Sequence, residues 1–141
     1  MQQLSTFVLN HWELFLALVI ILGLLAGTGL SHKLLGFKEV QPQELTHMIN
    51  RQNAVVFDVR EDKEFSEGHI VNAVHVPLSN LEARLKSLEK FKSRPVVTTC
   101  QTGDRSARAA AILRKQGFEP VYKLAGGLMA WRGAKLPLST K

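Results

Sequence analysis

The sequence has a single cysteine, Cys100, among its 141 residues. A lone cysteine excludes an internal disulfide, so the fold depends on its apolar core. An unpaired thiol is also typical of proteins in a reducing compartment. The five histidines are scattered along the chain and form no ligand cluster with the cysteine. We therefore expect neither a metal site nor a cofactor.

Basic residues are missing from the first 30 positions, where Glu13 is the only charged side chain. All 18 Lys and Arg and 11 of the 12 Asp and Glu fall in residues 31–141, which gives that part a formal charge of +7. Such an excess favours an anionic membrane surface or small anionic substrates as partners. Nucleic acid is not expected, because the basic residues are dispersed and no nucleic-acid-binding motif is present.

Charge is absent from Leu14 to Leu30, 17 consecutive residues that lie at the short end of what a membrane-spanning helix needs. A cleaved signal peptide is the alternative, but this run has no basic segment before it and no good cleavage site after it. A buried amphipathic helix would carry a polar stripe, which this run lacks. We therefore predict an N-terminal tail over residues 1–13, a transmembrane helix over 14–30 and a tether over 31–37.

The flanks of this run predict its orientation. Glu13 precedes it, whereas Lys33 and Lys38 follow it. The positive-inside rule then places the N-terminus outside and the C-terminal part in the cytoplasm, as a single-pass membrane protein. A cytoplasmic location would also keep Cys100 reduced.

Strand-like and helix-like segments alternate through residues 38–138, with a tail over 139–141. Short apolar or β-branched runs predict strands at 54–59, 73–76, 96–100 and 120–124. Helical patterns lie at 42–49, 80–91, 107–114 and 126–131, and a short helix or turn lies at 61–68. The alternation predicts an α/β fold with a mainly parallel sheet and helices on both faces. Ligands of such sheets bind beyond the carboxyl ends of the strands, which is where Cys100 would lie.

The loop after Cys100 has the composition of an anion-binding site. It consists of Gln101, Thr102, Gly103, Asp104, Arg105 and Ser106, and a helix follows it. The first N–H groups of a helix have no internal partner and carry the positive end of its dipole. A loop packed against them can turn its own N–H groups inward, which favours the thiolate form of Cys100. Arg105 would add a fixed positive charge at the rim.

Three segments together resemble the rhodanese-like family. Asp58-Val59-Arg60-Glu61 with Glu64-Phe65, Gly68-His69-Ile70, Ala73 and Pro77 resembles its first signature, Cys100 to Ser106 its active loop, and Leu124 to Trp131 its L-x-G-G-x-x-A-W segment. The match covers about residues 38–138. An apolar N-terminal run before a single such domain is similar to the membrane-anchored rhodanese-like proteins of bacteria.

The resemblance implies a sulfurtransferase without a cofactor. Cys100 would take a sulfane sulfur from thiosulfate or a persulfide donor, and would pass it to a thiol or to cyanide. The rival hypothesis is a non-catalytic adaptor that binds a membrane protein. A cysteine phosphatase or arsenate reductase is disfavoured, because those relatives use a seven-residue loop and Cys100 to Arg105 counts six.

Four further residues need an interpretation. Asp104 stands where the family often has a basic or neutral side chain, and its charge should weaken thiosulfate binding. Asp58 and Arg60 follow a strand and are expected near the pocket, where we favour structural ion pairs over a direct role. His69 is interpreted as a hydrogen-bonded turn residue rather than a general base.

Overall fold

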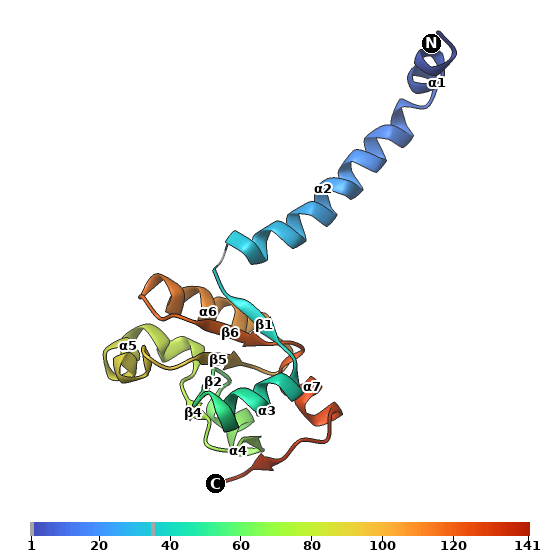
Figure 1. Cartoon of the computed structure of the whole chain (residues 1–141). Coiled ribbons are helices and arrows are strands. Elements are labelled where there is room, and N and C mark those ends of the chain that lie inside the picture. Colours follow the sequence, from blue (N-terminus) through green and yellow to red (C-terminus); the bar gives the residue numbers. More distant parts are fainter. Residues whose placement is uncertain (1, 35) are drawn as a thin grey trace. The chain divides into compact units, whose positions relative to one another are not determined.

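The structure is a computed structural model that describes the backbone of residues 2–34 and 36–141, and the side chains of residues 3, 5–27 and 36–141. The chain divides into two units, an N-terminal helical unit up to residue 34 and an α/β unit over the remainder (Figure 1). The two units are described separately.

The N-terminal unit consists of α1 (Gln2–Asn10) and α2 (Trp12–Leu34). Apart from Glu13 in its first turn, the described side chains of α2 are apolar, and they are exposed, including Leu16, Ile20 and Leu24. The predicted transmembrane helix over 14–30 falls inside α2, and its residues 28–30 lie outside the described side chains. Among the fully described residues, no helix combines the length and apolarity that a membrane crossing requires.

The α/β unit is built on a sheet of five parallel strands in the order β1-β6-β5-β2-β4. The strands are β1 (Lys38–Val40), β2 (Val55–Asp58), β4 (Val74–His75), β5 (Val96–Thr99) and β6 (Val121–Leu124). Every residue of β2 and β5 is buried, because these apolar runs occupy the middle of the sheet. The predicted parallel α/β fold is confirmed.

Helices cover both faces of the sheet (Figure 1). On one face, α5 (Leu81–Leu88) and α6 (Asp104–Lys115) share a core cluster with Phe57, Val96 and Val121. On the other face, α3 (Pro42–Arg51) and α7 (Gly127–Gly133) pack on alternate strand residues such as Val56 and Val97. Successive strand residues point to opposite faces, so one short run supplies both cores.

Two of the predicted helices have different bounds in the structure. The helix predicted over 80–91 is α5 flanked by two 3-10 segments, Leu78–Asn80 and Glu89–Phe91. The helix predicted over 107–114 begins earlier, at Asp104, so the second half of the predicted loop is helical. The reason is Gly103, whose φ of 128° lets the chain turn into the helix at once.

The remaining elements are short. They are α4 (Asp62–Ser66) and a two-stranded antiparallel sheet of β3 (His69–Ile70) and β7 (Leu138–Ser139). The sequence assigned Ser139 to the C-terminal tail, but Ser139 pairs with His69 in this small sheet.

Candidate active site

The polypeptide brings Cys100 to the carboxyl edge of the sheet. β5 ends at Thr99, Cys100 follows, and α6 begins four residues later at Asp104. Cys100 is only 1% exposed, whereas Thr102 and Asp104 are exposed and Gln101 is half-buried. The sulfur therefore lies beneath a short loop that reaches the surface.

Main-chain amides converge on the sulfur. The N–H of Gly103 donates to Cys100 Sγ at 3.0 Å, and the N–H of Ser106 donates at 3.4 Å. The thiol itself donates to the Ser106 hydroxyl at 3.5 Å, and that hydroxyl donates to the Gly103 carbonyl at 2.8 Å. The inward-facing N–H groups expected from the sequence are thus present. They form an anion-binding cup around the sulfur, and the role of this cup in catalysis stays a prediction.

The start of α7 holds the loop in this orientation. The N–H groups of Leu128 and Met129 donate to the carbonyls of Cys100 and Gln101, at 2.8 and 3.2 Å. The Gln101 carbonyl shares its peptide with the Thr102 N–H, so a carbonyl that points toward α7 turns this N–H the other way, toward the sulfur whose pKa it helps to lower. Gly127 allows the contact, because a Cβ there would stand 2.5 Å from the Cys100 carbonyl oxygen. Gly127 of the third signature therefore serves a close backbone approach, whereas a Cβ on Gly126 would meet the Cβ of Ala130 at 2.7 Å.

The loop lowers the pKa of Cys100. Burial is the largest single influence and by itself raises the pKa of the thiol. It is outweighed by the Ser106 hydroxyl and by the backbone N–H groups of Ser106, Gly103 and Thr102. The amides stabilise the thiolate as donors, and the Ser106 hydroxyl does so when its proton turns from the Gly103 carbonyl to the sulfur, so the net shift of the pKa is downward.

Arg105 is engaged by a carboxylate that the sequence analysis gave no role. Its guanidinium forms a two-pronged pair with Glu64 of α4, with both N–O distances at 2.7 Å. The hydrogen bond from Arg105 lowers the pKa of Glu64 to about 2, against some desolvation, and Glu64 in turn raises the pKa of Arg105. The pair therefore stabilises the fold fully above about pH 4.5 and loses that contribution as the pH falls toward 2.

This pair corrects the expected charge at the rim. Arg105 remains cationic, but Glu64 offsets much of its field and ties α4 to the cysteine loop. Nothing in the sequence signals this pair, although Glu64 lies in the first signature three residues after Glu61. That spacing forms a capping box in which Glu64 also accepts the Glu61 N–H at 3.1 Å.

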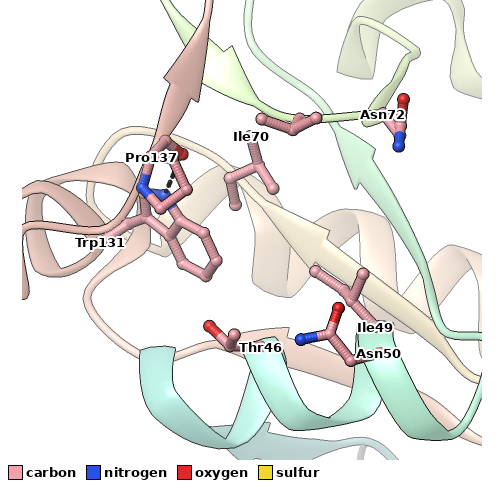
Figure 2. A pocket seen from close by; sticks show the side chains of 8 residues that line it. Thr46, Ile49, Asn50, Ile70, Asn72, Trp131 and Pro137 are labelled. Carbon is pink, nitrogen blue, oxygen red and sulfur yellow. Dashed lines mark hydrogen bonds between the residues drawn. The ribbon is translucent and has the colours of Figure 1, made fainter.

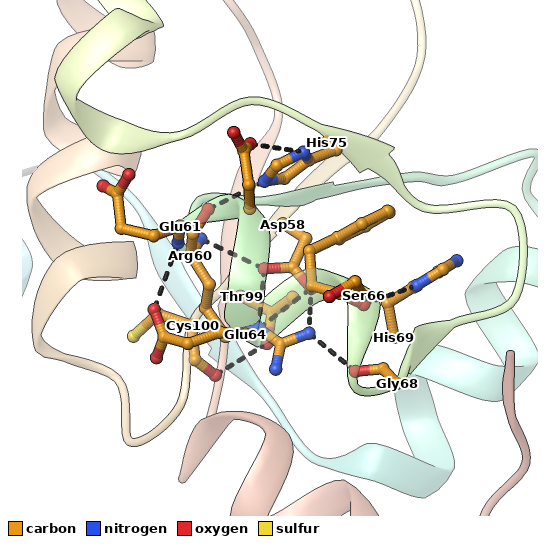
Figure 3. A network of polar contacts seen from close by, with 12 residues as sticks. Asp58, Arg60, Glu61, Glu64, Ser66, Gly68, His69, His75, Thr99 and Cys100 are labelled. Atoms are coloured by element: carbon orange, nitrogen blue, oxygen red, sulfur yellow. Dashed lines mark hydrogen bonds and ion pairs between the residues drawn. The ribbon is translucent and has the colours of Figure 1, made fainter. Parts of the chain in front are cut away.

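Asp58 and Arg60 form a buried ion pair beneath α4 (Figure 3). Their side chains are 0% and 1% exposed, and Arg60 Nη2 lies 2.7 Å from Asp58 Oδ2. The same nitrogen donates to the Gly68 carbonyl at 2.8 Å, and His75 contacts the Arg60 carbonyl at 2.8 Å. Asp58 and Arg60 thus contact each other and nearby backbone, and the preference for a structural role over a direct one stays a prediction.

His69 is buried and bound to backbone at both ring nitrogens. Nδ1 lies 2.9 Å from the Phe65 carbonyl and Nε2 lies 3.0 Å from the Lys141 carbonyl. Its ring stacks on Phe65 with a centroid distance of 3.7 Å. These contacts fit the interpretation as a turn residue, and they occupy both nitrogens that a general base would use.

A pocket of about 260 Å³ lies elsewhere, between α3, β3 and α7 (Figure 2). Its walls include Ile49, Ile70 and Trp131, and Trp131 Nε1 donates to the Pro137 carbonyl at 2.9 Å. No residue of the cysteine loop lines it. Across the described residues, no group of three or more His, Cys, Asp or Glu side chains is placed to hold a metal ion.

The five-stranded parallel sheet, with a cysteine loop at its carboxyl edge, defines a rhodanese-like domain. Residues 41–134 match that family, and the chain belongs to it. The resemblance found in the sequence is confirmed at the level of the domain.

Individual relatives agree with this assignment. The protein YibN of Escherichia coli strain K12 is 32% identical over 139 residues, which cover 98% of this chain and 97% of that one. The thiosulfate sulfurtransferase GlpE of Pseudomonas fluorescens is 36% identical over 96 residues, 68% of this chain and 85% of that protein. The crystal structure of a rhodanese-related protein from Thermoplasma volcanium is similar with a TM-score of 0.68 and 28% identity, covering 74% of this chain and all of that one.

Proposed function

We propose that the protein is a sulfurtransferase in which Cys100 carries the transferred sulfur as a persulfide. The observation that carries the proposal is the pair of main-chain amides, from Gly103 and Ser106, that donate to Cys100 Sγ. The sulfurtransferase name of a relative such as GlpE supports the same chemistry.

The proposed reaction balances without a cofactor. The Cys100 thiolate attacks the outer sulfur of thiosulfate, a new S–S bond forms, and the S–S bond of the donor breaks with both electrons leaving on sulfite. The terminal sulfur of the resulting persulfide is anionic, and the cup that favours the thiolate also favours this anion. A thiolate or cyanide acceptor then attacks that terminal sulfur and regenerates the Cys100 thiolate.

The depth of the sulfur favours a slender donor. Cys100 is 1% exposed, so a donor reaches it end-on through the loop or after the loop opens. A terminal sulfane sulfur is a single atom wide, whereas a tetrahedral phosphoester or arsenate needs a wider cup. The six-residue loop from Cys100 to Arg105 is consistent with the smaller ligand.

Intact-protein mass spectrometry tests the proposal. After incubation with thiosulfate or a small-molecule persulfide, the wild-type chain should gain the mass of one sulfur atom, and cyanide should remove it as thiocyanate. Cys100→Ser should gain nothing, because Cys100 is the only cysteine in the sequence. If no donor labels the wild-type chain, the sulfurtransferase is excluded and a non-catalytic adaptor that binds a membrane protein is favoured.

Asp104 should make thiosulfate a weak donor. It is exposed at the first turn of α6, beside the loop that receives a dianion. Asp104→Lys should lower the KM for thiosulfate by about threefold to tenfold, because a unit-charge interaction near the surface is on the order of 1 kcal/mol. Steady-state kinetics at low and high salt measure this, and the gain should shrink as salt screens the charge. An unchanged KM at low salt would show that Asp104 does not oppose the donor.

We also propose that α2 anchors the protein in the bacterial inner membrane, with the N-terminus outside and the α/β unit in the cytoplasm. The support is the uncharged run 14–30 and the exposed apolar side chains of the described part of α2. The full chain should stay with membranes after carbonate extraction, whereas a chain lacking residues 1–37 should be released. Release of the full chain would contradict the anchor, and cleavage of the α/β unit by protease added to spheroplasts would contradict the orientation.

A further inference from the structure

Lys123 is a mostly buried cation at the carboxyl edge of the sheet. It lies in β6, where its Cα partners are Glu39 on β1 and Thr98 on β5. Its side chain is 12% exposed, and its Nζ lies 3.1 Å from Glu39 Oε1, whose side chain is 42% exposed. The ammonium therefore lies deeper than the carboxylate that pairs with it.

The ammonium contacts the cysteine loop at Gly103. Lys123 Nζ lies 3.5 Å from the point that a Cβ on Gly103 would occupy. Gly103 is also the residue whose N–H donates to Cys100 Sγ at 3.0 Å, the shorter of the two amide contacts. One glycine thus separates the lysine cation from the sulfur.

This position is unfavourable for a cation unless an anion lies nearby. Gly103 is the N-cap of the 12-residue helix α6, whose dipole presents partial positive charge there. Burial adds a desolvation cost, and the carboxylate of Glu39 that pairs with the ammonium is the more exposed partner. A negative sulfur on Cys100 would add a second anion, separated from the ammonium by Gly103.

We propose that Lys123, oriented by Glu39, is a positioning residue that stabilises negative charge on the Cys100 sulfur from the Gly103 side of the loop. Arg105 supplies charge from the α4 side, but shares it with Glu64. The inference rests on the proposed function, since it assigns Lys123 a part in holding the thiolate and the persulfide.

The charged groups around the loop come from four elements. They are Glu39 on β1, Lys123 on β6, Asp104 and Arg105 on α6, and Glu64 on α4 with its N-cap Glu61.

The test is the pH dependence of alkylation of the full chain by iodoacetamide. Cys100 is the only cysteine, so the rate reports on this thiol alone. Lys123→Met removes the cation, so the pH at which the alkylation rate is half its maximum should rise. Below this midpoint, alkylation should slow by about threefold to tenfold. Glu39→Gln removes the carboxylate that offsets the cation and should move the midpoint to lower pH. Midpoints that move in opposite directions in the two variants would support the proposal.

A merely structural ion pair would respond differently. Loss of either partner would then break the same pair and disturb the loop in the same direction. Shifts of the same sign, or no shift in either variant, would overturn the proposal. Lys92→Met and Glu89→Gln, which break an exposed pair at 3.8 Å, serve as matched controls and should leave the profile unchanged.

The two proposals fail separately. If the midpoints move apart but no donor produces a persulfide, the sulfurtransferase is excluded and the charge effect on the thiolate stands. If a persulfide forms while both midpoints stay in place, Lys123 has no such effect. Glu39→Gln alters a half-exposed side chain, so it gives a folded test even if Lys123→Met does not fold.

Discussion

Gly127→Ala should slow persulfide formation at Cys100 by about tenfold to a hundredfold. The new Cβ would stand 2.5 Å from the Cys100 carbonyl oxygen and 2.7 Å from that of Gln101, and neither backbone atom can rotate away. Because Leu128 and Met129 bind these two carbonyls, a shift there displaces the start of the cysteine loop and turns the Thr102 amide, which shares its peptide with the Gln101 carbonyl and helps to lower the pKa of Cys100. A displacement of about 1 Å in a reacting group is enough for such a loss.

The same substitution should lower the free energy of unfolding by about 2–4 kcal/mol. The φ of Gly127 is 59°, a left-handed conformation that costs a residue with a Cβ about 1–2 kcal/mol, and the crowding adds to this. Donor-labelling rates and urea denaturation measure the two effects. Gly133→Ala in the same helix is the matched control, because nothing lies within 4 Å of its Cβ position. Equal behaviour of the two variants would show that α7 does not shape the cysteine loop.

Asp58→Asn should lower the free energy of unfolding by about 3–5 kcal/mol. The substitution keeps the shape of the side chain but leaves the guanidinium of Arg60, which is 1% exposed, without its counter-charge. Arg60 also donates to the Gly68 carbonyl, so the segment between α4 and β3 should loosen with it. Urea denaturation of the α/β unit, followed by circular dichroism, measures the change.

Two comparisons sharpen this prediction. Glu89→Gln breaks an exposed pair and should cost less than about 1 kcal/mol. Adding Arg60→Met to Asp58→Asn should recover part of the loss, because it removes the uncompensated charge. A single Asp58→Asn variant as stable as the wild type would mean that burial of this pair contributes nothing to the fold.

The sequence predicted the central elements because their patterns are strong. β2 and β5 are continuous buried runs, and their order with the helices determines a parallel sheet. It gave no sign of β1 as a strand, since only Val40 of its three residues is buried. It also gave no sign of the pairing of β3 with β7, because two-residue strands far apart in the chain leave no periodicity.

The sequence predicted the chemistry of the candidate site, but not the side-chain contacts that surround the cysteine loop. The single cysteine, Gly103 and the following helix were sufficient to predict amides around a sulfur. The pairing of Arg105 with Glu64 was not, because side chains 41 positions apart meet only through the tertiary fold. The buried position of Lys123 could not be predicted for the same reason, since an isolated lysine in a strand is typical of a surface residue.

The hydrogen bonds from α7 to the loop couple reactivity to completion of the fold. The residues that orient the Cys100 and Gln101 carbonyls lie more than 25 positions downstream in the chain, so the ribosome makes them after the cysteine. Until α7 docks, the Cys100 and Gln101 carbonyls lack these two hydrogen bonds, and the cysteine loop lacks its backbone attachment to α7. During synthesis, the support of the reactive loop is thus complete only after the chain has been made through α7.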